Sequence, residues 1–153
     1  CFHSDTAAAN ALDDYEEGSW TPSLSDAASG GNTYSGGGNW TTYANYTKIG
    51  NTVRVHLNAY ALSNTGMNSH QIFIHGFPFV SNSGTVTSFV VMQYFTEVGN
   101  TAFGPFVQIN NGESIGRLSK MKNDNNGNQT VQWNHIKTNG YFGFQFNIIY
   151  QSV

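Results

Sequence analysis

Residues 52–62 read Thr-Val-Arg-Val-His-Leu-Asn-Ala-Tyr-Ala-Leu, a run in which polar and apolar side chains alternate. Successive side chains of a β-strand point to opposite faces of its sheet, so this period of two indicates a strand with one buried face. Residues 141–150 repeat the pattern with larger side chains. We expect the apolar sides of both stretches to share one core, made of Val53, Val55, Leu57, Phe142, Phe144, Phe146 and Ile148.

Shorter apolar segments at near-regular spacing, separated by Gly and Asn turns, predict further strands. They cover residues 19–25, 71–76, 86–95, 103–110, 115–121 and 130–136. Pro22, which has no amide proton to donate, suggests an edge position for the first of them. Many short strands of this kind predict an all-β fold, an antiparallel β-sandwich of jelly-roll type. We expect this sandwich over residues 19–153, after a short helical or extended lead-in over residues 1–18.

The chain is unusually poor in charge, since 10% of its residues are Asp, Glu, Lys or Arg and soluble domains average about 25%. With six Lys and Arg in total and a formal net charge of −3, it lacks the clustered cations that bind the phosphates of nucleic acids. No apolar run approaches the roughly 20 residues of a membrane-spanning helix, so membrane insertion is not expected. A surface of neutral amides, hydroxyls and aromatic rings suits sugars or other copies of the same chain.

Three segments carry a resemblance to a known family. Residues 6–22, Thr-Ala-Ala-Ala-Asn-Ala-Leu-Asp-Asp-Tyr-Glu-Glu-Gly-Ser-Trp-Thr-Pro, resemble the segment that leads from the shaft into the C-terminal head of bacteriophage tail fibres and tailspikes. Residues 46–53, Tyr-Thr-Lys-Ile-Gly-Asn-Thr-Val, and residues 74–79, Ile-His-Gly-Phe-Pro-Phe, resemble the same family in order and spacing. The resemblance implies a homotrimer in the extracellular tail fibre of a virion, joined to the rest of the fibre. It implies a role in host attachment or fibre assembly and supplies no catalytic motif.

The leading interpretation is a non-catalytic head that recognises a host cell-surface glycan or protein receptor. A sugar ring stacks its C–H face on an exposed aromatic ring, while nearby amides and imidazoles bond its hydroxyls. Residues 26–46 and 122–135 are expected to be loops with this composition. The predicted carbohydrate-binding residues are Tyr34, Trp40, Tyr43, Trp133 and His135. For the tryptophans the alternative is a place in the core or in a subunit contact, where aromatic residues are common.

Other interpretations follow from the same residues. A structural module that trimerises or caps the fibre, with no ligand of its own, would share the fold. A glycan-degrading enzyme has less support, because no nucleophile elbow or paired-carboxylate motif stands out. The acidic run at residues 13–17 lacks the spacing of a calcium loop, and the histidines lack the spacing of a zinc site. We therefore expect no metal, no cofactor and no catalytic residue.

Overall fold

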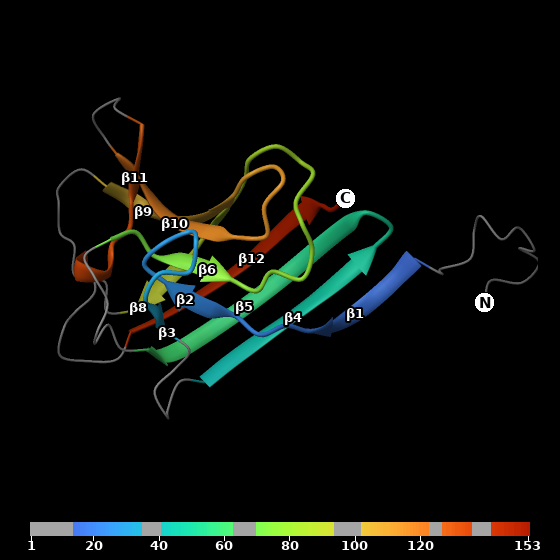
Figure 1. The fold of residues 1–153 in the computed structure, drawn as a ribbon, viewed down its shortest axis with the longest axis horizontal. Coiled ribbons are helices and arrows are strands. Elements are labelled where there is room, and N and C mark those ends of the chain that lie inside the picture. Colours follow the sequence, from blue (N-terminus) through green and yellow to red (C-terminus); the bar gives the residue numbers. More distant parts are fainter. Residues whose placement is uncertain (1–13, 35–40, 63–69, 94–101, 123–126, 136–141) are drawn as a thin grey trace, which may run out of the picture.

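The computed structural model describes residues 14–34, 41–62, 70–93, 102–122, 127–135 and 142–153, and these form a two-sheet antiparallel β-sandwich (Figure 1). One sheet has the strand order β1 (Tyr15–Ser19), β4 (Thr41–Ile49), β5 (Thr52–Leu62), β12 (Phe142–Gln151) and β8 (Val91–Gln93). The other has the order β3 (Thr33–Tyr34), β2 (Ser23–Ser25), β6 (Phe73–His75), β10 (Gly116–Lys122), β9 (Ala102–Ile109) and β7 (Val86–Phe89). A short strand, β11 (Asn128–Thr130), pairs with β10, and a 3-10 turn, η3 (Trp133–His135), follows it. The all-β sandwich predicted from the sequence is confirmed, and no helix within the described ranges is long and apolar enough to cross a membrane.

The two alternating stretches form the central pair of the five-stranded sheet. Strand β5 has the predicted limits, and β12 begins and ends one residue later than predicted. They pair antiparallel along most of their length, with Leu57 opposite Phe146 and Val55 opposite Ile148. The expected shared core is confirmed, because all seven residues named for it are buried in a single cluster.

Two predicted strands are in fact each divided between the sheets. The prediction of one strand over residues 19–25 is wrong, since β1 belongs to the five-stranded sheet and β2 to the other. Trp20 turns into the core at the crossing, where its indole Nε1 donates to the carbonyl of His56 at 3.2 Å. The prediction of one strand over residues 86–95 is wrong for the same reason, because β7 and β8 lie in different sheets on either side of buried Val90.

Three further segments differ from the prediction. Residues 41–46, predicted as loop, are the first part of β4, a strand paired on both sides. Its inward side chains include the small Ala44 and the amphipathic Tyr46, so the sequence shows no apolar alternation there. The strand predicted over residues 130–136 is wrong: β11 ends at Thr130 and the η3 turn follows. In addition, β1 brings residues 15–18 of the predicted lead-in into the sandwich; the helical turn proposed before them lies outside the described residues.

The segments that resemble tail-fibre heads pack against one another. Tyr46 has its ring edge-on to Phe79, with 5.4 Å between centroids, and its hydroxyl donates to Glu16 Oε1 at 2.5 Å. The rings of Trp20 and Phe77 lie 5.0 Å apart. We call this group the lead-in cluster; it consists of Glu16, Gly18, Trp20, Tyr46, Gly76, Phe77 and Phe79.

Two glycines allow the close approach inside the lead-in cluster. A Cβ atom on Gly18 would lie 2.9 Å from the Tyr46 ring. Gly76 has a φ of +89°, and a Cβ atom there would lie 2.3 Å from the carbonyl oxygen of Thr21. A side chain at either position would collide with another of the three segments. The packing therefore gives a structural reason for these glycines to accompany the aromatic residues.

The Gly76 contact can be tested against a second glycine with a similar backbone. Gly84 has a φ of +70° and nothing within 4 Å of an added Cβ. Gly84→Ala should cost about 1–2 kcal/mol, the usual penalty of a left-handed L-residue. Gly76→Ala adds a collision with backbone and should cost more than about 3 kcal/mol, measured by urea unfolding. Equal losses in the two variants would contradict the close packing of residues 74–79 on the lead-in.

Candidate functional site

The structure locates three of the five predicted carbohydrate-binding side chains. Trp40 lies outside the described residues. Tyr34 pairs with Leu24 through its backbone in β3, and its side chain is not described. Tyr43, Trp133 and His135 lie in described elements, and they lie in three different environments.

Tyr43 lies on the outer face of the five-stranded sheet, with 61% of its surface exposed. It pairs with Asn58 on β5; Asn58 pairs with Gln145 on β12, and Gln145 with Val91 on β8. Paired residues of antiparallel strands point to the same face, so these side chains form one row across four strands. At about 4.8 Å between strands, the row is roughly 14 Å long.

Tyr60 lies two residues beyond Asn58 on the same face of β5 and is 44% exposed. A shallow hollow of about 40 Å³ lies beside it, lined partly by Asn58, Val91 and Gln145. We call Tyr43, Asn58, Tyr60, Val91 and Gln145 the sheet-face patch. It combines two exposed phenol rings with two amides and contains no charged residue, which is the chemistry that suits a neutral sugar.

Hydrogen-bond donors continue along the outer face next to the sheet-face patch. Arg54 donates from Nη2 to Asn147 Oδ1 at 3.1 Å, and His56 Nδ1 lies 3.2 Å from the same oxygen. The pairing of His56 with both Asn45 and Asn147 places this group in the row adjacent to Tyr43. Polar groups held in this way extend the area over which a flat ligand can bind.

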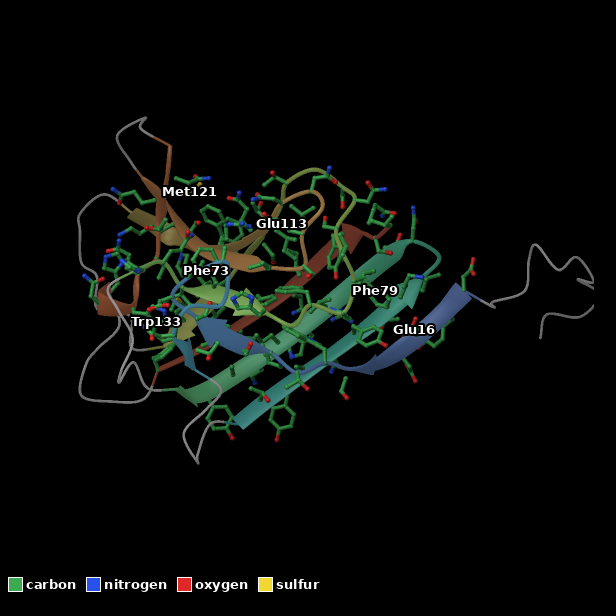
Figure 2. All side chains as sticks on the ribbon, in the orientation of Figure 1. Glu16, Phe73, Phe79, Glu113, Met121 and Trp133 are labelled. Atoms are coloured by element: carbon green, nitrogen blue, oxygen red, sulfur yellow. The ribbon has the colours of Figure 1, made fainter. Side chains whose placement is uncertain are left out.

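Trp133 is a core residue, so its predicted role as a stacking platform is corrected. Its side chain is 1% exposed, and its Nε1 donates to the carbonyl of Ser25 at 3.1 Å. Its ring meets Phe142 edge-on, with 6.0 Å between centroids. The η3 turn directs the indole between the sheets, which leaves no face for a sugar. Figure 2 places Trp133 toward one end of the sandwich and Glu16, with Phe79, toward the other.

His135 lies two residues after Trp133 and is half-buried at the edge of an open pocket of about 360 Å³. We call it the Lys120–His135 pocket; its lining residues are Lys120, Gln129, Thr130, Gln132 and His135. His135 Nδ1 accepts a hydrogen bond from the backbone N–H of Gln132 at 3.1 Å. A neutral imidazole that accepts at Nδ1 carries its proton on Nε2.

Burial lowers the pKa of His135 from its ordinary value of 6.5, and the positive charge of Lys120 lowers it further. Burial also lowers the pKa of the Lys120 ammonium. A low-dielectric surrounding disfavours the charged form of each group, and two like charges disfavour each other. Both influences on His135 therefore favour its neutral imidazole.

A third hollow, of about 180 Å³, was not foreseen from the sequence. It lies on the seven-stranded sheet and is lined by Thr87, Ser88, Phe89, Phe106, Met121 and Asn128. Phe89 is 72% exposed, an unusual state for so large an apolar side chain. The period-two pattern of β7 offered no signal, because Val86 and Ser88 are partly buried while Thr87 and Phe89 are exposed.

The acidic run contributes tyrosine contacts in the part that the structure describes. Glu16 accepts from the Tyr46 hydroxyl and Glu17 from the Tyr15 hydroxyl, each at 2.5 Å. These hydrogen bonds to a carboxylate raise the pKa of both phenols. Among the described residues, no three His, Cys, Asp or Glu side chains are grouped to hold a metal ion.

Comparison with known proteins adds no family. No protein-family model matches the chain, and no curated protein matches it significantly.

The depressed pKa of His135 predicts a pH dependence of stability. Between the lowered pKa and 6.5, the unfolded chain binds more protons at this site than the folded chain does, so the free energy of unfolding should rise with pH. The His135→Gln variant lacks this contribution. The difference in unfolding free energy between wild type and variant should therefore shrink as the pH falls through 6.5. Urea titrations at a series of pH values measure it; a constant difference would contradict the buried, neutral imidazole.

Proposed function

We propose that this chain is a non-catalytic, receptor-binding head at the tip of a bacteriophage tail fibre, and that it recognises a host cell-surface glycan. The observation that carries the proposal is the sheet-face patch, an uncharged surface that combines two exposed phenols, two amides and exposed Val91 from four adjacent strands. Strands hold such a surface more rigidly than loops do, and a preformed site loses less entropy on binding.

The position of the patch supports a role at the fibre tip. Tyr15, where β1 begins, pairs with Ile49 at the end of β4. Tyr43 lies six residues before Ile49 on the same strand, about 20 Å away at the usual rise per residue. A ligand surface on a fibre head is expected to lie away from the end where the chain enters from the shaft, and both Tyr43 and the Lys120–His135 pocket satisfy this condition.

We further propose jelly-roll winding for the sandwich. Strands β5 and β6 follow one another in the sequence but lie in different sheets. Each pairs with a strand from late in the chain, β5 with β12 and β6 with β10. This nesting of early against late strands is the feature of a jelly roll that the strand order supports. The lead-in cluster supports the tail-fibre resemblance, because the three segments that carry the resemblance contact one another in it.

A homotrimer is proposed on a separate observation. Tyr15 and Ile49 form an exposed pair on the outer face of the five-stranded sheet, and exposed Ile149 lies on the same face. Apolar side chains grouped near the lead-in are suited to contact between subunits. If this face serves assembly and the chain has no ligand of its own, the second candidate function applies, a structural module that trimerises or caps the fibre.

Glycan recognition by the sheet-face patch can be tested with conservative and truncating changes at one residue. Tyr43→Ala removes the stacking ring and should reduce binding on an array of host glycans by roughly tenfold or more, as the loss of base-stacking aromatics does elsewhere. Tyr43→Phe keeps the ring and should retain most of the binding.

Phe89→Ala is the matched control, since it removes an exposed ring from the opposite sheet. It should leave array binding unchanged. Unfolding midpoints of all three variants should stay close to wild type. Equal binding by Tyr43→Ala and wild type would place any receptor site elsewhere.

The assembly proposal predicts three times the chain mass of 16.7 kDa in light scattering at micromolar concentration. Ile149→Asp places a charge in the proposed contact and should shift the population toward monomer, because burying an unpaired charge is costly. A wild-type protein that is a stable monomer at this concentration would refute the trimer.

A further inference from the structure

Arg54 lies near the middle of the outer face of the five-stranded sheet, and its side chain is exposed. Its backbone pairs with Thr47 on β4 and with Ile149 on β12. The side chain leaves this row, because its Nη2 donates to Asn147 Oδ1 at 3.1 Å. Asn147 pairs with His56 in the row beside the sheet-face patch. The guanidinium is therefore held on the side of the sheet-face patch.

The contacts of Asn147 decide which groups its two neighbours offer to a ligand. Arginine has donors and no acceptor, so the atom that Arg54 meets is the carbonyl oxygen of the amide. His56 Nδ1 lies 3.2 Å from the same oxygen, and it therefore carries a proton that it donates. In the neutral ring Nε2 is then the acceptor. Guanidinium donors and an imidazole acceptor thus lie side by side. We call Arg54, His56 and Asn147 the Arg54 group.

The guanidinium of Arg54 has no carboxylate partner in the part of the chain that the structure describes. The ion pair found there joins Arg117 to Glu113, at the other sheet. Glu17, the acid on this face of β1, lies two strands from Arg54, and its carboxylate accepts from the Tyr15 hydroxyl. Two strand spacings amount to roughly 10 Å. An arginine has several N–H donors, so a single hydrogen bond to an amide leaves its charge and most of its donors for a ligand.

We propose that the Arg54 group binds the anionic oxygens of an acidic sugar, a carboxylate or a phosphate. A guanidinium matches either group with paired, charge-assisted hydrogen bonds, which are stronger than bonds between neutral partners. His56 Nε2 accepts from a hydroxyl group of the same sugar. Asn147 is the positioning residue, because its amide oxygen holds both side chains in place.

The Arg54 group lies close enough to the sheet-face patch for one glycan to contact both. His56 and Asn58 are two residues apart on the same face of β5, about 7 Å along the strand. A neutral ring can therefore lie on the sheet-face patch while an acidic neighbour lies on the Arg54 group. The inference deepens the proposed function by assigning an acidic sugar to the receptor, and this assignment rests on that function. The anion site itself stands on the contacts of Arg54.

Titration of the purified protein, followed by NMR, tests the site with three probes. Methyl glucuronide carries a carboxylate, glucose 6-phosphate carries a phosphate, and methyl glucoside is the neutral counterpart of both. The signals of the Arg54 Nε–H and the His56 ring should move with at least one anion and stay in place with methyl glucoside. A response to methyl glucuronide alone identifies a carboxylate site, and a response to glucose 6-phosphate identifies a phosphate-accepting site. No response to either anion, or an equal response to methyl glucoside, would overturn the proposal.

Variants at two exposed positions locate the bound anion. Arg54→Met removes the charge, keeps the apolar stem and should weaken anion binding by about tenfold or more, the loss expected for hydrogen bonds to a charged group. Asn147→Asp is nearly isosteric and gives Arg54 a carboxylate of its own, so it should weaken anion binding as well. Lys48→Met is the matched control, because it removes the same charge from the same sheet, where Lys48 lies over the Phe79 ring. Unchanged affinity in either folded variant, or an equal loss in Lys48→Met, would contradict the location.

The array of host glycans, probed with the same variants, separates this inference from the proposed function. Arg54→Met should lose binding to acidic glycans and keep binding to neutral ones, whereas Tyr43→Ala should lose binding to both. Array binding that depends on Tyr43 and not on Arg54 would refute the Arg54 group alone. Anion binding that depends on Arg54, without any effect of Tyr43 on the array, would refute the sheet-face patch alone.

Discussion

The pairing of β5 with β12 is the constraint on which the rest of the sandwich depends. In this register every second residue of both strands faces inward, so Val55 and Leu57 lie beside Ile148 and Phe146 in one continuous wall. A shift of either strand by one residue would turn its apolar side to solvent and bring its polar residues inside, Arg54 and His56 for β5 or Asn147 for β12, at a large cost in desolvation. The three phenylalanine rings of β12 stack in succession along this wall, with centroids 6.4 Å apart. Trp133 and Phe77 then pack on the ends of that stack.

The residues that carry the tail-fibre resemblance form a structural contact, the lead-in cluster, and they are not the residues of the candidate sites. The aromatic rings and glycines of the three segments contact one another, so these segments specify how the chain enters the sandwich. The sheet-face patch and the Lys120–His135 pocket draw on other residues toward the opposite end. Under the proposed function, a chain could keep the lead-in cluster while its ligand surface changes, so that a common frame serves different receptors.

The candidate sites show which functional residues could be found from the sequence. The aromatic ring of Tyr43 is what marks it as a candidate in the sequence. Tyr43 lies on a strand and not in the predicted loop, and the sequence did not predict this strand because β4 lacks an apolar alternation. Tyr60 could have been found, since it lies on the polar side of the clearest alternating stretch. Trp133 was misassigned because its neighbours are polar, and only the η3 turn directs it inward. Lys120 gave no signal at all, since a lysine near a strand end is ordinarily exposed.

The sequence by itself determined the fold class, the two longest strands and the seven residues of their shared core. It could do so because side-chain alternation is a local property and the burial of one strand face follows from it directly. The tertiary structure decided where the chain crosses between sheets, which strands are neighbours and which polar residues share a row. Tyr43, Asn58, Gln145 and Val91 come from four strands spread over about 100 residues, and hydrogen bonding between strands alone brings them together. The same holds for Lys120 and His135, whose proximity depends on the packing of η3 beside β10 and has no counterpart in local sequence.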